Sequence, residues 1–267
     1  MYLQQDNKGF AFAYSEKGGG MHVYGREFYE YINRGAIASA EVVVALLAEQ
    51  LSVRSIADFG CGQGAWLSVW RRFGAAETIG IDGDYVTRES LLIQPSDFVA
   101  ADLGAPVRLG RTFDLVQSLE VAEHLPAPAA AQFIDSLVAH GRIVLFSAAV
   151  PGQGGENHVN ERPYEYWRRL FRERRYVPLD AVRPRIVRDP VVEPWYRYNT
   201  LLYVHESRLD SMPPALTRMR IPDDAPIADL SPLKYRMRKG LLRMLPVKVV
   251  SLLATTKHRL VLRADRA

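Results

Sequence analysis

Hydrophobic residues between positions 53 and 206 fall into short, nearly continuous runs, separated by stretches with helical spacing. Strands that are apolar on both faces are typical of parallel sheets covered by helices on both sides. Their alternation with helices therefore predicts an open α/β sheet with right-handed crossovers. The predicted strands are 55–59, 78–81, 97–100, 114–118, 142–148, 176–182 and 200–205.

Helices are predicted where apolar residues recur every three or four positions. A long helix over 27–51 precedes the first strand, and Gly35 is expected to interrupt it. A helix over 160–175 is expected to use Asn160 as its cap and Glu161 in its first turn. The other predicted helices are 65–73, a short piece at 87–92, and 129–140.

A glycine-rich loop, Asp58-Phe59-Gly60-Cys61-Gly62-Gln63-Gly64, joins the first buried strand to a helix. Glycines allow a tight turn there and let a ligand approach the backbone. Their spacing differs from the dinucleotide fingerprint, and the Lys-Ser/Thr pair of a phosphate loop is missing. The loop thus favours a cofactor whose charge is an amino-acid group. The alternative is a plain tight turn.

Two acidic residues follow the next two predicted strands. Asp82 ends the second strand, 18 residues after Gly64, where a carboxylate can accept hydrogen bonds from ribose hydroxyls. Asp102 follows the third strand and is placed to meet an adenine amino group. Either acid alone would be an ordinary loop residue. The ordered set of glycines and acids instead indicates a nucleoside-containing cofactor.

On these motifs the chain resembles the class I S-adenosylmethionine-dependent methyltransferases over about 53–206. The resemblance implies a doubly wound, Rossmann-like sheet of seven mostly parallel strands whose last strand is antiparallel. It also implies S-adenosylmethionine as the cofactor. The matching segments are Asp58–Gly64, Ile79–Asp82, Ala101–Leu103 and Phe113–Glu120. By this resemblance Gly60, Gly62 and Gly64 line the methionine part, Asp82 the ribose, and Asp102 with Leu103 the adenine.

Further residues are expected beside the cofactor. Tyr24 and Arg26, before the first long helix, can cover it as a lid, or they can pack at the N-terminus. Cys61 is expected to fill space in the loop rather than to act as a nucleophile. The remaining expected cofactor contacts are Asp58, Cys61, Gly83, Leu119 and Glu120.

Two histidines lie beyond the predicted fourth and fifth strands, where open α/β sheets bind ligands. Methyl transfer to a hydroxyl requires an aligned acceptor and removal of its proton. His124, after the fourth strand, and His158, in a glycine-rich loop, are therefore the candidate catalytic residues. The alternative for His158 is a loop histidine that caps a helix or lies in solvent. Trp195–Asn199 can form an acceptor wall or pack in the core.

The segment Glu120-Val121-Ala122-Glu123-His124 has two interpretations. In one, Glu120 lies near the cofactor and His124 packs or caps a turn. In the other, Glu120, Glu123, His124 and His158 bind a divalent metal such as Mg or Mn. The second is similar to a metal-binding subset of the family that includes small-RNA 2′-O-methyltransferases. There the metal would hold both hydroxyls of a diol and lower the pKa of the attacking one. No second histidine follows close to His158, so the pattern is incomplete.

Charge divides the chain into an acidic body and a basic tail. Residues 231–267 contain ten Lys/Arg and one acid, whereas the other residues carry 24 basic and 29 acidic groups. The predicted regions are 1–52, an aromatic and helical lid; 53–208, a cofactor-binding methyltransferase domain; and 209–267, a linker with a basic helical tail. The tail is expected to pack on the body or to contact anionic lipid, and nucleic acid ranks lowest.

Composition excludes a disordered or fibrous chain, with 48% hydrophobic and 24% charged residues. No apolar run approaches the length of a membrane span, and the single cysteine allows no internal disulfide. We expect a cytoplasmic protein whose tail can touch the inner membrane face. We expect it to methylate a hydroxyl of a small molecule or glycan. The alternatives are an RNA 2′-O-methyltransferase and a non-catalytic scaffold with the same fold.

Overall fold

A computed structural model describes residues 10–11, 23–24, 26–246 and 249–256, and it describes side chains from Asn33 onward. Its centre is a seven-stranded sheet. In spatial order the strands are β5 (Phe98–Ala100), β4 (Glu77–Asp82), β3 (Ser55–Phe59), β6 (Leu115–Leu119), β7 (Ile143–Ser147), β9 (Leu201–His205) and β8 (Tyr176–Leu179). Strand β9 runs opposite to the other six strands, and it pairs antiparallel with both β7 and β8. The predicted doubly wound α/β fold is therefore confirmed.

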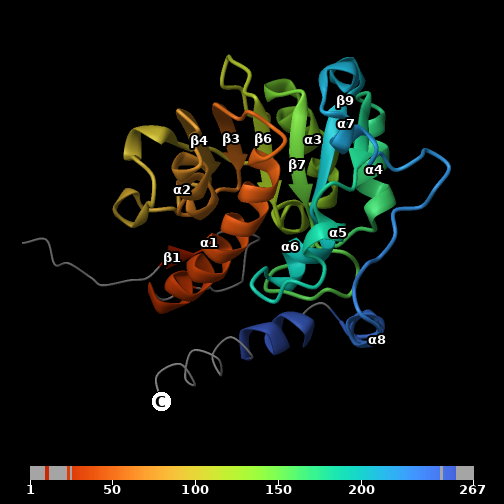
Figure 1. The fold of residues 1–267 in the computed structure, drawn as a ribbon. Helices are drawn as coiled ribbons and strands as arrows, with labels where there is room; N and C mark the ends of the chain where they lie inside the picture. Colours follow the sequence, from red (N-terminus) through yellow and green to blue (C-terminus); the bar gives the residue numbers. More distant parts are fainter. Residues whose placement is uncertain (1–9, 12–22, 25, 247–248, 257–267) are drawn as a thin grey trace, which may run out of the picture.

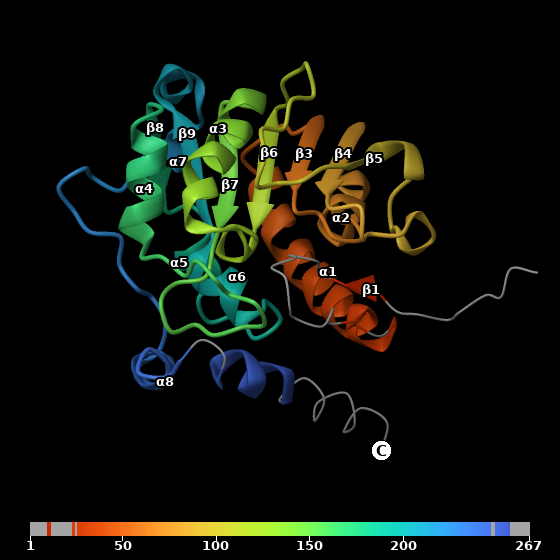
Figure 2. The same cartoon turned by 180° about the vertical axis from the view of Figure 1, so that it is seen from behind.

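Helices cover both faces of the sheet (Figures 1 and 2). One apolar core lies between the sheet and the helices α1 (Arg26–Ala48) and α2 (Ala65–Arg72). A second core lies under α3 (Ala130–His140) and α4 (Tyr164–Arg172) on the opposite face. Because the central strands contact helices on both sides, their residues are buried throughout, as the continuous apolar runs predict.

Shorter elements complete the chain. A two-stranded antiparallel sheet is formed by β1 (Phe10–Ala11) and β2 (Val23–Tyr24). The remaining helices are α5 (Arg183–Ile186), α6 (Pro194–Asn199), α7 (Pro214–Thr217) and α8 (Leu233–Leu242), and residues 249–256 are also helical. Single 3₁₀ turns are η1 (Arg88–Ser90), η2 (Pro95–Asp97), η3 (Ala122–His124), η4 (Ala127–Ala129) and η5 (Glu206–Ser211). No helix within the described ranges is long and apolar enough to cross a membrane.

Two local helix predictions are wrong. The helix expected over 160–175 begins at Tyr164, after Pro163. Asn160 does not cap it, because the Asn160 side chain accepts a hydrogen bond from Arg162. Helix α1 runs through Gly35 without a break, and the missing side chain leaves room there for the carboxylate of Glu193.

The ends of the chain are more closely integrated than the predicted regions imply. Val43, Val44 and Leu47 of α1 are fully buried in the first core, so this half of the helix is part of the domain rather than a lid. The stretch expected to be a linker is packed as well, with Met212 and Ile227 buried. The basic tail is helical in its described part, as expected.

Candidate active site

The glycine loop between β3 and α2 combines a tight backbone with an open face. Gly60 has a φ of 86°, and a Cβ there would lie 2.3 Å from the Val121 side chain. Gly62 has a φ of 53°, and a Cβ there would meet no described atom within 4 Å. Gly64 adopts a left-handed conformation where α2 begins. Gly60 is therefore required for packing, whereas Gly62 leaves open space for a ligand.

Asp58 is a buried acid directly beneath this loop, with 3% of its surface exposed. Burial raises its pKa to about 8, and the negative charge of Asp82 adds to the shift. The nearby Gln117 side chain opposes the shift. The carboxyl group of Asp58 is thus poised to lose its proton when a positive charge arrives.

Asp82, at the end of β4, closes the loop from the neighbouring strand. Its carboxylate accepts hydrogen bonds from the backbone N–H of Gly62 at 2.6 Å and of Gly83 at 2.7 Å. The Tyr85 hydroxyl also donates to Asp82. Burial raises the pKa of Asp82, and these three bonds oppose the shift. A ribose hydroxyl at Asp82 would have to share this carboxylate with Tyr85.

The other expected cofactor residues differ in how far their side chains are buried. Asp102 is exposed after β5, and its carboxylate accepts a bond from the Gly104 N–H. The Leu103 side chain is buried in the second core. The Cys61 thiol is buried, and its sulfur lies against Gly80 of β4, as a space-filling residue would. Burial raises the pKa of the Cys61 thiol well above its usual value.

The expected lid can be placed only by its backbone. Tyr24 ends β2 and Arg26 begins α1, but their side chains lie outside the described residues. Farther along α1, the Asn33 side chain donates a hydrogen bond to the Gln63 side chain of the glycine loop at 2.5 Å. Helix α1 therefore touches the loop that is expected to hold the cofactor.

The structure brings His124 and His158 together. Their rings meet edge to face with centroids 4.9 Å apart. His158 Nδ1 lies 2.9 Å from Glu161 Oε1, so the carboxylate fixes the orientation of the ring. Partial burial raises the pKa of Glu161, but hydrogen bonds from His158, Gly154 and Gly152 outweigh it and lower the pKa overall. Glu161 was expected in a helix rather than as a partner of His158.

Glu123 is the most unusual group beside these histidines. Its side chain is fully buried, and neither carboxylate oxygen has a partner at hydrogen-bond geometry within the described part of the chain, although the backbone N–H groups of Glu123 and Ala149 lie close enough to lower its pKa. Burial raises its pKa well above the usual value, and Glu120 adds to the shift. Burial lowers the pKa of half-buried His124 to about 3, with a further contribution from His158. His124 is therefore neutral at neutral pH.

Donor atoms of Glu123, His124 and His158 lie within 4.8 Å of one another. One carboxylate and two imidazoles are suitable ligands for a divalent transition metal. A buried carboxylate without a partner is costly unless a proton or a cation compensates it. These three residues therefore fit a divalent metal.

Glu120, the fourth predicted metal ligand, has other partners. Its carboxylate accepts bonds from Gln153 Nε2 at 2.6 Å and Asn199 Nδ2 at 3.2 Å. Asn199 also donates to Gln153 Oε1 at 2.7 Å. Glu120 has a φ of 57°, which is unusual for a residue with a side chain and marks a strained turn after the buried Leu119. Sequence reasoning missed Gln153, and it named Asn199 only as part of an aromatic segment.

The predicted acceptor wall, Trp195–Asn199, mostly serves the core. It forms α6, and Tyr196 is buried with its ring edge-on to Trp66. Of this segment, Asn199 is the residue whose side chain bonds to Glu120 and Gln153 beside the histidines.

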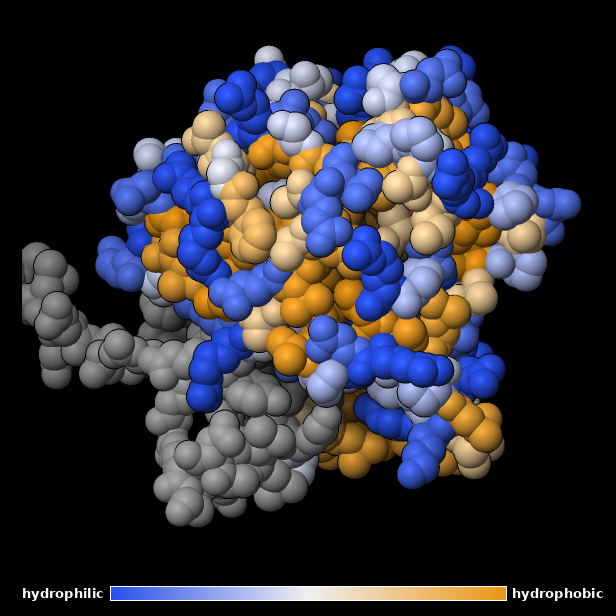
Figure 3. Space-filling model, viewed as in Figure 1, coloured by the Kyte–Doolittle hydropathy of each residue, from blue (hydrophilic) through white to orange (hydrophobic). Residues whose placement is uncertain are grey.

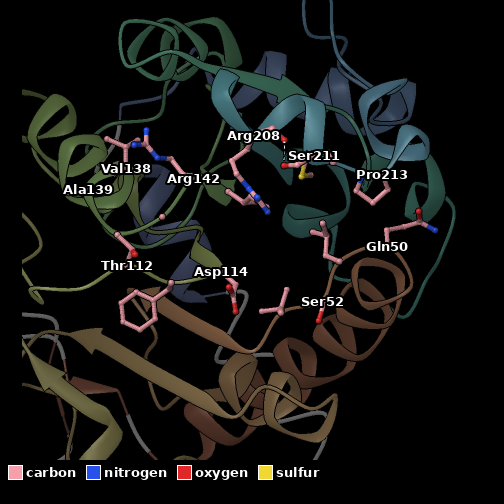
Figure 4. A pocket seen from close by; sticks show the side chains of 16 residues that line it. Gln50, Ser52, Thr112, Asp114, Val138, Ala139, Arg142, Arg208, Ser211 and Pro213 are labelled. Atoms are coloured by element: carbon pink, nitrogen blue, oxygen red, sulfur yellow. Dashed lines mark hydrogen bonds between the residues drawn. The ribbon is translucent and has the colours of Figure 1, made fainter.

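A cavity of about 840 Å³ opens at the opposite edge of the sheet (Figure 4). It is lined by Ser52, Asp114 and Arg142, which precede or begin β3, β6 and β7, and by Arg208. Open α/β sheets bind ligands at the carboxyl ends of their strands. The glycine loop and the two histidines lie at those ends, so we place the active site there and not in this cavity.

Comparison with known proteins identifies the family. Residues 29–182, more than half of the chain, match the family described as methyltransferase domain. No curated protein sequence matches the chain significantly.

Several solved structures of methyltransferases are similar to the chain. A sugar N-methyltransferase from Streptoalloteichus is similar with a TM-score of 0.54 and 17% identity, covering 74% of this chain and 99% of that one. An O-methyltransferase family protein from Burkholderia thailandensis has a TM-score of 0.48 and 14% identity, covering 66% and 59%. Magnesium protoporphyrin IX methyltransferase from Synechocystis, solved with S-adenosylmethionine, has a TM-score of 0.46 and 18% identity, covering 71% and 87%.

The family match covers the glycine loop, Asp82, Asp102 and both histidines. The chain therefore belongs to the methyltransferase-domain family, and its cofactor is S-adenosylmethionine.

Proposed function

We propose that this methyltransferase acts on a hydroxyl group of a small molecule or a sugar. The observation that carries the proposal is the pair formed by His158 and Glu161, with Nδ1 and Oε1 2.9 Å apart. With Nδ1–H donated to the carboxylate, Nε2 keeps its lone pair for a proton from the acceptor. Hydroxyl acceptors need such a base, whereas a neutral amine can attack without one.

The reaction is an in-line displacement. The acceptor oxygen forms a bond to the methyl carbon while the carbon–sulfur bond breaks, and S-adenosylhomocysteine leaves. The acceptor proton passes to His158 Nε2, and Glu161 stabilises the resulting imidazolium. A positioned base of this kind contributes about 10²–10⁴-fold to the rate. The protein otherwise aligns acceptor, methyl and sulfur.

A divalent metal at Glu123, His124 and His158 would give His158 a different role. Such an ion, when bound, supplies a Lewis acid that lowers the pKa of an acceptor hydroxyl. Glu161 would then orient His158 as a ligand, as carboxylates commonly do for metal-bound histidines. Glu120, held by Gln153 and Asn199, would remain beside the site rather than in it.

The proposal is tested with methyl-labelled S-adenosylmethionine and matched acceptors, namely polyhydroxylated sugars and amino sugars. We expect S-adenosylhomocysteine to form with hydroxyl acceptors, and mass spectrometry and NMR to locate the label on oxygen. Label on nitrogen, label on RNA that ribonuclease removes, or no turnover by protein that binds the cofactor would contradict the proposal.

The role of His158 is tested by His158→Ala, with His205→Ala as the control. His205 lies at the end of β9 and bonds to Ser207, away from the glycine loop. We expect His158→Ala to reduce turnover about 10²–10⁴-fold while the affinity for S-adenosylmethionine stays unchanged. Activity that is lost with a chelator and restored by magnesium or manganese would assign His158 as a metal ligand.

A further inference from the structure

The inner side of α8 is fixed against the body of the protein. Lys239 is only 2% exposed and forms an ion pair with Asp229. The backbone of α8 also lies so close to Gly152 that a Cβ there would be 2.1 Å from the Lys239 carbonyl oxygen. These contacts determine which side of the helix faces outward.

The helix contacts the loop that carries His158. Arg238 Nη1 donates a hydrogen bond to the Gln153 carbonyl oxygen at 2.9 Å. Arg243 Nε donates to the Pro151 carbonyl oxygen at 2.8 Å. In Figures 1 and 2, α8 accordingly lies beyond the carboxyl ends of the parallel strands. The outer side of α8 therefore belongs to the same edge of the molecule as the candidate active site.

The outer side of α8 is apolar and exposed. Leu233, Met237 and Leu241 are four residues apart, share one face, and are 64%, 62% and 67% exposed. Large apolar residues continue along the chain beyond the helix, at Met244, Leu245, Val249, Leu252 and Leu253, and all are exposed. Figure 3 shows hydrophobic residues at this lower edge of the molecule, with hydrophilic residues between them. Soluble monomers seldom expose so many neighbouring apolar side chains without a binding partner.

Positive charge borders this apolar face. Lys234 and Arg236 are exposed on either side of it. Residues 231–256 contain six Lys/Arg and no acid. A partner protein would usually offer charges of both signs, whereas an anionic bilayer offers hydrocarbon beneath a continuous layer of negative headgroups.

We propose that α8 and the helical residues 249–256 dock on an anionic phospholipid surface. Their apolar side chains would enter the headgroup–acyl boundary, and the flanking cations would meet lipid phosphates. This orientation would turn the loop over 151–161 toward the membrane, so that acceptors held at the lipid surface reach the site without crossing bulk solvent. The docking is independent of the acceptor atom.

The test is sedimentation of the full chain with phosphatidylcholine vesicles, with and without phosphatidylglycerol. We expect binding to the anionic vesicles that weakens with added salt. Met237→Glu/Leu241→Glu should reduce the affinity at least about tenfold, because two apolar contacts are lost. Lys234→Ser/Arg236→Ser should reduce it about fivefold per cation. Val191→Glu places a single Glu on an apolar residue of the body that is 54% exposed, and should bind like the wild type.

Unchanged calorimetric binding of S-adenosylmethionine shows that each variant is folded. No preference of the wild type for anionic vesicles would overturn the proposal, as would wild-type binding by Met237→Glu/Leu241→Glu. If the wild type forms a dimer and does not bind vesicles, and Met237→Glu/Leu241→Glu is a monomer, the face would be assigned to a second copy of the chain. Binding to single-stranded RNA in place of vesicles would assign the charge to nucleic acid.

Discussion

Replacing Glu123 by Gln tests whether the Glu123 carboxylate binds a metal or has only a structural role. The Glu123 side chain is fully buried and neither oxygen has a partner at hydrogen-bond geometry among the described residues, so without a cation it is held as an acid with unsatisfied oxygens or as an uncompensated charge, and both cost stability. Gln keeps the shape and cannot carry the negative charge that a cation would bind. In the presence of chelator we therefore expect the Glu123→Gln variant to be at least as stable as the wild type.

The magnitude follows from the missing hydrogen bonds. An unsatisfied buried polar group costs about 1–3 kcal/mol, more when it is charged, and the Gln amide recovers only part of this. One kcal/mol corresponds to about 2–4 °C in melting temperature for a chain of this size. A metal at about a hundred times its dissociation constant would stabilise the wild type by roughly 2.7 kcal/mol, and this gain requires the carboxylate.

Thermal melts with chelator and with manganese measure both effects. We expect the order of stability to cross over: the variant equals or exceeds the wild type in chelator, and the wild type exceeds the variant in manganese. Glu41→Gln, a change at an exposed acid, serves as the control and should stay within about 0.5 kcal/mol of wild type throughout. A Glu123→Gln variant that is less stable in chelator, or a wild type that manganese does not stabilise, would refute the reasoning.

Three further predictions concern the cofactor loop and the base. The Asp58 pKa is about 8 in the folded chain against 3.8 as the ordinary value, so wild-type stability falls as pH rises between them, by up to about 1.4 kcal/mol per pH unit. In urea unfolding at several pH values, the stability of Asp58→Asn should not show this fall with pH. A variant whose stability falls with pH in parallel with the wild type would count against the prediction. Gly62→Ala should weaken cofactor binding in calorimetry yet leave the fold intact, whereas Gly60→Ala should lower the melting temperature; the reverse pattern would contradict the assigned roles. Glu161→Gln should reduce turnover about 10–100-fold by releasing His158, and wild-type rates would show that Glu161 does not orient the base.

Much of the fold could be predicted because its strands are buried on both faces. Continuous apolar runs such as Leu115–Leu119 mark central strands without reference to any distant residue. The helix start at 160 was misplaced because Asn160 and Glu161 have the composition of a helix terminus. Their side chains instead bond to Arg162 and His158.

The site was only partly predictable because its partners are far apart in sequence. Glu120 and Asn199 are 79 residues apart, and Glu120 and Gln153 are 33 apart. No local pattern encodes such pairs, since the sheet topology decides which loops meet. Asp82, by contrast, ends a predicted buried strand and His158 lies in a glycine-rich loop after another, and these positions alone marked them as candidates.

The pairing of β3 with β6 joins two stretches of sequence that carry different parts of the candidate site. The loops that follow β3, β4 and β5 hold the cofactor motifs, whereas those that follow β6 and β7 carry His124 and His158. The halves meet at one parallel seam, where Ile56, Ala57 and Asp58 pair with Leu115, Val116 and Gln117. If His124 and His158 act on the acceptor as proposed, changes downstream of β6 can alter the choice of acceptor while the upstream half keeps its methyl donor. The same seam is the natural crossover point for chimeras with other members of the family.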